Sequence, residues 1–181
     1  MIDVKAAARL PRGLKFTRNG LSADARRIEI GVVDVRDRAV HLADEDYAHD
    51  LAPLPIRVPN GRHRVYAFQW EHAGEAISVC AVISFRRQLF AVARPLLIDN
   101  PARPDLTEGI AVDSGKVHIE AATSLTIPSG LGDGYYPVFA ILNFGLVVQA
   151  IVIDFEIWTV RHVILQDHQE LDEFGMIRSC D

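Results

Sequence analysis

The 181-residue chain is predicted to be an all-β protein, a duplicated β-sandwich of two similar halves followed by a short C-terminal helix. Three observations support this prediction. Blocks of sequence recur in the same order, short β-branched runs alternate with Gly and Pro turns, and 49% of the residues are apolar. That apolar fraction is sufficient for a packed core and argues against disorder.

The internal repeat consists of four blocks, and each second copy lies 69 to 77 residues after the first. Any one match between β-rich segments is weak, but four in register favour a duplication. The offsets change only where loops are expected, because surface loops tolerate insertions. The blocks are 40–42 with 117–119, 56–61 with 125–130, 65–68 with 138–141, and 82–85 with 152–155.

Residues 1–27 are predicted to form an N-terminal extension, and 28–86 the first β-repeat. Pro11 ends the one helical turn that the preceding alanines favour. Within the repeat, apolar side chains at alternate positions from Ile77 to Phe85 indicate a strand with one buried face.

A linker over 87–108 is expected to follow an extended path because of its prolines. The second β-repeat covers 109–156 and repeats the plan of the first. The remaining residues, 157–181, are predicted to form a further strand and a short helix over 166–174, with Gly175 as its cap.

The segment Tyr135–Ile153 carries no charge and is long enough to span a bilayer. Pro137 and Asn143 interrupt it, however, and its earlier copy carries charged residues at the turn. A hairpin explains both copies, so we predict a soluble protein without a membrane span. The N-terminus lacks the apolar core of a secretory signal, and two cysteines form no disulfide framework, which favours the cytoplasm.

The chain contains no recognisable catalytic, metal or cofactor motif, and we expect neither a cofactor nor a metal. His41 and His118 occupy equivalent places in the two repeats, and Asp34 and Asp113 precede them. These four residues are the candidates for a pocket between the repeats. A metal site needs three or four converging ligands, so we expect solvent-facing histidines and solvated aspartates here.

The net charge of −5 is unevenly distributed, because residues 154–181 hold seven acids and two arginines. This acidic region is a candidate contact surface for a basic protein partner. Nucleic acid binding is disfavoured by the acidic balance. The candidate contact residues are Asp167, Glu170, Asp172 and Glu173, with Trp158 either an interface anchor or a core residue.

Three stretches, Ile127–Gly130, Gly132–Val138 and Val152–Phe155, resemble a group of small bacterial β-domains. The group includes uncharacterised families, toxin-immunity proteins and ComJ-like competence nuclease inhibitors. The resemblance implies a bacterial cytoplasmic protein that acts by binding another protein, and it brings no active-site residues.

Three hypotheses follow. The first is an intracellular protein-binding module, such as an inhibitor or immunity protein whose partner is a basic toxin or nuclease. The second is a small-molecule-binding protein or hydrolase with its site between the two repeats. The third is a self-associating structural domain, which would form homo-oligomers.

Overall fold

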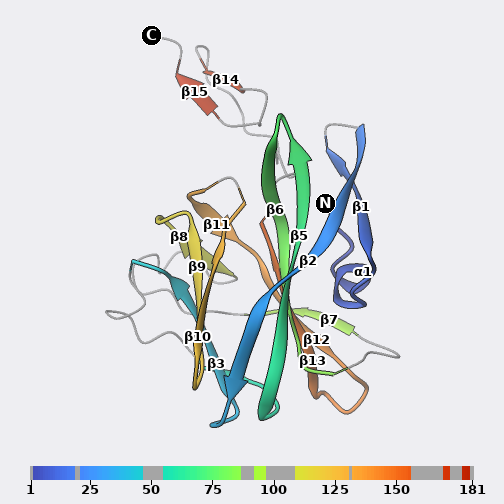
Figure 1. Ribbon diagram of the computed structural model, residues 1–181, viewed down its shortest axis with the longest axis vertical. Helices are drawn as coiled ribbons and strands as arrows, with labels where there is room; N and C mark the ends of the chain where they lie inside the picture. The colour runs from blue at the N-terminus through green and yellow to red at the C-terminus, as the bar shows by residue number, and fades with distance from the viewer. Residues whose placement is uncertain are drawn as a thin grey trace.

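The structure is a computed structural model, and it describes residues 2–18, 21–46, 55–86, 92–96, 109–130, 132–155, 169–171 and 177–179. Almost all of its regular structure is β, as predicted (Figure 1). Its described helix is the five-residue α1 (Val4–Ala8). Among the described residues, no helix is both long enough and apolar enough to cross a bilayer.

The largest element is a seven-stranded antiparallel sheet, in which β2 and β5 run through much of the length of the molecule (Figure 1). Its strand order places the hairpin β5–β6 next to the hairpin β13–β12, so that β6 and β13 are neighbours at the centre. In order across the sheet the strands are β1 (Gly13–Arg18), β2 (Leu21–Val35), β5 (Gly61–His72), β6 (Glu75–Ser84), β13 (Val148–Asp154), β12 (Val138–Leu142) and β7 (Val92–Pro95).

A second, four-stranded sheet has β9 and β3 at its centre and β10 and β4 at its edges. Two short strand pairs, β8–β11 and β14–β15, complete the described elements. The strands of the four-stranded sheet are β10 (Ser124–Pro128), β9 (Lys116–Glu120), β3 (Ala39–Asp44) and β4 (Ile56–Arg57), and the pairs are β8 (Ile110–Val112) with β11 (Gly134–Tyr136) and β14 (Gln169–Leu171) with β15 (Ile177–Ser179).

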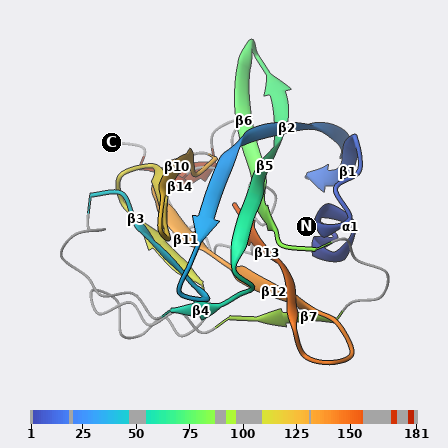
Figure 2. The ribbon, with the colours of Figure 1, turned by 60° about the horizontal axis from the view of Figure 1, so that its bottom comes forward.

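The two larger sheets form layers, and α1 lies on the side of the seven-stranded sheet away from β3, β9 and β10 (Figures 1 and 2). The layers approach closely at Gly31, where an added Cβ would lie 3.1 Å from the Leu125 side chain. A larger residue on β2 at this crossing would require the Leu125 side chain to shift. The turn after β9 is tied to β2 as well, because the backbone N–H of Asp34 donates to the Thr123 hydroxyl at 2.9 Å.

The core between the layers consists of side chains at alternate positions on the facing strands, as period-two strands require. Fully buried members come from both sheets and from both halves of the chain; they include Val33, Val40, Leu42, Ile83, Val117, Ile119, Ile127, Ile151 and Ile153.

The strand registers follow the internal repeat of the sequence. At the centre of the large sheet Val82 pairs with Val152, and at the centre of the small sheet Leu42 pairs with Ile119. In each case the repeat matches the same two residues with one another. The hairpins also share one register, because Tyr66 pairs with Val82 just as Phe139 pairs with Val152.

The segment predicted to be a linker, 87–108, contributes strand β7 to the large sheet. Pro95 of β7 lies opposite Phe139, as Glu29 of β2 lies opposite Tyr66 in the other hairpin. Pro95 lacks a backbone N–H, which an edge strand tolerates.

The C-terminal helix predicted over 166–174 is not confirmed. Its described residues, Gln169–Leu171, form β14 and pair antiparallel with β15. A helix of nine residues is marginal in isolation, whereas a paired strand gains hydrogen bonds from a neighbour. The further strand predicted within 157–165 lies outside the described residues.

Truncation of Ile83 or of Ile153 to alanine tests the equivalence of the two central strands. Both side chains are completely buried, and each lies opposite a valine of its own hairpin. We expect each substitution to lower the free energy of unfolding by about 2–5 kcal/mol, measured by urea denaturation. A loss well below this at either position would show that the side chain lies in a looser environment than the structure assigns.

Candidate functional site

The loop Asn143–Val147, which joins β12 to β13, is the most unusual surface feature of the described residues. Asn143 closes it: the Val147 N–H donates to the Asn143 side-chain oxygen at 2.9 Å, and the Asn143 N–H donates to the Val147 carbonyl at 3.1 Å. Leu146 has a φ of 56°, in the left-handed region that disfavours a leucine. The loop is therefore fixed by hydrogen bonds while holding an apolar residue in a strained conformation.

The side chains on this loop are apolar and exposed. Phe144 is 83% exposed, Leu146 74% and Val147 41%, and Val92 on the neighbouring strand β7 is 53% exposed. These are four of the five large apolar side chains that are exposed in the described residues, the other being Ile28. Isolated exposed apolar residues are ordinary, but a cluster marks an interaction surface. We call these four residues the apolar tip; the β12–β13 loop projects beside β7 in Figure 2.

The charged side chains that the structure describes next to the apolar tip are two arginines. The loop contains no ionisable residue, and the exposed arginines Arg86 and Arg94 flank it. The backbone N–H of Arg86 donates to the Gln149 carbonyl at 3.1 Å, and Arg94 pairs with Ala140 on β12. Both arginines therefore lie at the base of the tip.

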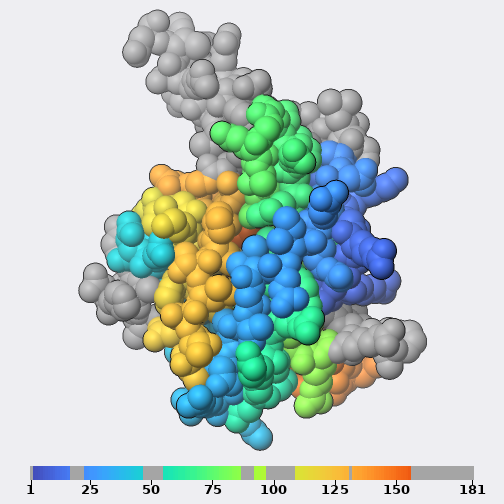
Figure 3. Space-filling view, viewed as in Figure 1, coloured from blue at the N-terminus to red at the C-terminus, as the bar shows by residue number. Residues whose placement is uncertain are grey.

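The other hairpin of the large sheet, β5–β6, ends quite differently. Its turn is formed by Ala73 and Gly74, both with positive φ, between the paired residues His72 and Glu75. Glu71 and Glu75 make this end acidic, and it forms the green upper end of the coloured residues in Figure 3. A hairpin of this kind therefore does not need apolar residues at its turn in order to fold.

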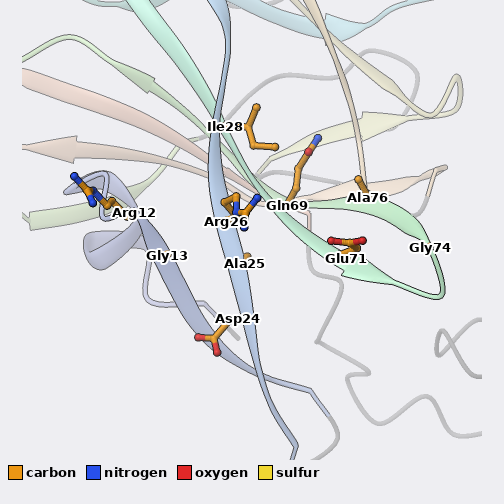
Figure 4. A pocket seen from close by; sticks show the side chains of 10 residues that line it. All are labelled: Arg12, Gly13, Asp24, Ala25, Arg26, Ile28, Gln69, Glu71, Gly74 and Ala76. Atoms are coloured by element: carbon orange, nitrogen blue, oxygen red, sulfur yellow. The ribbon is translucent and has the colours of Figure 1, made fainter.

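An open groove of about 550 Å³ lies on the large sheet, on strands β1, β2 and β5 and near the end of the β5–β6 hairpin (Figure 4). Its floor follows alternate residues of β2 and β5, which point to the same side of the sheet. The polar side chains that line it are Arg12, Asp24, Arg26, Gln69 and Glu71, and Ile28 is its exposed apolar residue.

His41 and His118 are brought onto adjacent strands, on the outer face of the four-stranded sheet. His41 pairs with Glu120 and His118 with Ala43, so the two imidazoles are diagonal neighbours. A ring nitrogen of His118 lies 3.3 Å from the Thr126 hydroxyl. In the described part of the chain, no group of three or more His, Cys, Asp or Glu side chains could hold a metal ion.

The aspartates considered with these histidines do not join them in one site. Asp34 lies beside Thr123 at the turn after β9, whereas Asp113 lies beside Asp44 at the turn before β9. The two carboxylates are thus at opposite ends of that strand. Asp34 also forms an ion pair with Arg36 at 3.1 Å, as a solvated surface carboxylate does.

The acidic contact residues of the C-terminal region fall largely outside the described residues. The structure does not describe Trp158, Asp167, Asp172 or Glu173. Glu170 lies on β14, where the structure describes only the backbone.

Sequence reasoning identified neither the apolar tip nor the groove. A signal for the tip was present: Phe144, Leu146 and Val147 occupy a turn, where Gly, Asn, Asp and Ser normally prevail. The groove had no such signal, because it depends on how far β5 and β6 extend beyond the smaller sheet.

Buried Asp44 connects the first half of the chain to the second. Its carboxylate accepts backbone N–H groups from Ser114 at 2.9 Å and from Asp113, in the turn before β9, and from Asp46 at 2.8 Å. Burial acts to raise the pKa of Asp44, but the N–H groups of Ser114, Asp113 and Asp46 outweigh it, so the pKa lies below its usual value.

Asp44→Asn should therefore lower stability in a pH-dependent way. A carboxyl whose pKa is lower in the folded state stabilises the fold above its unfolded pKa of about 3.9, and this contribution is lost as the pH falls through the folded pKa. We expect the variant to lose about 1–3 kcal/mol at pH 7, and the difference from the parent to shrink below about pH 4. Urea denaturation across this range measures both, and a difference independent of pH would contradict the assignment.

Cys80 is completely buried on β6, where it pairs with Asp154 of β13. Burial, reinforced by the negative charge of Asp154, raises the pKa of the Cys80 thiol well above its ordinary value. Little thiolate therefore forms at neutral pH, and a nucleophilic role is not supported.

In a Cys180→Ser variant, Cys80 should react with a thiol reagent at pH 8 at least about tenfold more slowly than free cysteine. Denaturant should restore the ordinary rate, because unfolding exposes the thiol. Rapid labelling of the native protein would contradict the burial of this residue.

Comparison with models of known protein families, with curated proteins and with solved structures found no match to this chain.

Proposed function

We propose that the chain is a protein-binding module built from two copies of one β-unit, and that the apolar tip is its contact surface. The single observation that carries the proposal is the clustering of exposed Phe144, Leu146 and Val147 at the end of the β12–β13 hairpin with exposed Val92 on the adjoining strand β7. The resemblance of the second repeat to immunity proteins and nuclease inhibitors suggests an inhibitor of a bacterial toxin or nuclease.

The duplicated architecture is supported by the strand registers. Two units related by an approximate twofold axis would pair equivalent residues at that axis, as Val82 pairs with Val152 and Leu42 with Ile119. Each unit would then cover the apolar face that the other leaves open. In this arrangement the two hairpins are equivalent, and their differing tips are free to carry separate roles.

A binding role for the apolar tip is supported by its unfavourable local energetics. Leu146 adopts a conformation that is unfavourable for a leucine by about 1–2 kcal/mol, yet its side chain is mostly exposed to water. Exposed Phe144 likewise contributes little to the core. A binding role explains why the loop carries apolar residues that add little to the stability of the fold. Aromatic and aliphatic side chains that become buried against a partner contribute most of the binding energy at interfaces.

The partner's surface is expected to combine an apolar pocket with negative charge at its rim. Arg86 and Arg94 at the base of the tip would then meet carboxylates, which adds specificity and a faster encounter. The acidic residues of 154–181 are a separate candidate contact for a basic partner, and that hypothesis rests on charge alone.

A small-molecule site between the two repeats receives less support. The pairs at the centre of each sheet, Val82 with Val152 and Leu42 with Ile119, are apolar and at most 1% exposed. A ligand at these positions would have to displace buried apolar side chains. His41 and His118 lie on the outer face of the four-stranded sheet, away from the core between the layers.

The stability of a tip variant separates a folding role from a binding role. We expect Leu146→Gly to leave the free energy of unfolding unchanged or to raise it by up to about 1 kcal/mol, because glycine adopts the left-handed conformation without strain. Thermal or urea denaturation measures the change. A loss above about 1 kcal/mol would mean that Leu146 supports the fold.

Binding is tested with the double variant Phe144→Ser/Leu146→Gly and with Glu75→Gln at the other hairpin as the matched control. A partner captured by the parent chain and then purified should bind the double variant at least about tenfold more weakly and the control equally well. Equal affinity for all three proteins would remove the apolar tip from the interface.

A further inference from the structure

The polar side chains of the groove are unusual because they do not pair with one another. Arg12, Arg26, Asp24 and Glu71 supply two positive and two negative charges. Among the residues that the structure describes, none of these side chains, nor that of Gln69, forms a hydrogen bond or an ion pair. The groove is therefore a neutral site that displays unpaired charges of both signs.

Opposite charges elsewhere on the same surface do pair. Arg64 on β5 lies 3.4 Å from Glu29 on β2, and Lys116 lies 2.8 Å from Glu45. The first of these pairs uses the same two strands as the groove. The geometry of β2 and β5 thus permits ion pairs. The charged side chains of the groove nevertheless form none with one another, although residues of opposite charge lie on these same strands.

The charges are also distributed across the groove. Arg12 lies at the start of β1, where its carbonyl accepts the Arg27 N–H, and its side chain lies apart from that of Arg26 in Figure 4. Glu71 comes from β5, on the far side of Gln69 from Arg26 (Figure 4). Ile28 adds an apolar surface on β2, 39% exposed. A ligand lying across β2 and β5 would meet the Arg26 guanidinium at one end and the Glu71 carboxylate at the other.

We propose that this groove binds a small zwitterion, of the class of a short peptide with free ends. Arg26 receives the ligand carboxylate, for which its guanidinium group provides two parallel hydrogen bonds. Glu71 receives the ammonium group, Gln69 hydrogen-bonds the peptide unit between them, and Ile28 contacts an apolar side chain. The volume of about 550 Å³ lies in the range of small-ligand sites. The proposal is independent of the apolar tip, which is formed by β7, β12 and β13.

The probe is L-alanyl-L-alanine, with binding followed by calorimetry and by NMR on the full chain. Its N-acetyl derivative lacks the ammonium charge and its C-terminal amide lacks the carboxylate. We expect each blocked form to bind at least about tenfold more weakly than the free dipeptide, because each loses a charge-assisted contact.

Variants assign each end of the ligand to its residue. Arg26→Gln should remove the difference between the dipeptide and its amide, and Glu71→Gln should remove the difference between the dipeptide and its acetyl derivative. Arg64→Gln, the matched control outside the groove, should change neither. Absence of saturable binding at millimolar dipeptide, equal affinity for the free and blocked forms, or the same pattern in Arg64→Gln would overturn the proposal.

Discussion

The ladder between β6 and β13, at the centre of the seven-stranded sheet, is the interaction on which the rest of the structure depends. Each of these strands is the inner member of a hairpin, and alone it would present a row of unpaired backbone groups to water. Pairing the two strands removes both edges and buries Val82 and Val152 completely. The β3–β9 ladder does the same for the smaller sheet, so both layers are closed by contacts between distant halves of the chain.

The sequence predicted the hairpins better than it predicted their surroundings. The alternation from Ile77 to Phe85 identifies β6 because one face of that strand is buried and period two is then visible. Hairpin registers follow from matched apolar faces, since a slip by one residue would turn those faces to solvent. Strand β7 has a weaker sequence signal, because its four residues carry little pattern and an edge strand tolerates a proline.

One register in the smaller sheet departs from the repeat. The sequence matches Ile56 with Leu125, yet Val40 pairs with Ile56 whereas the equivalent Val117 pairs with Ile127. The edge strand of one half has therefore shifted by two residues relative to the other. A shift of two keeps each side chain on its original face, so the core tolerates it. The apolar tip and the groove lie away from the paired centres of the sheets, at hairpin ends where strand lengths differ: β5 has 12 residues and β12 has five.

The short helix α1 has a consequence for the order in which the chain becomes structured. At five residues it is too short to persist alone, and it packs on β6, β7, β12 and β13. These strands follow α1 at a distance of many residues, so α1 has no surface to pack on until nearly all of them have been synthesised. A chain interrupted before residue 154 would therefore leave residues 4–8 without their packing surface and open to proteases.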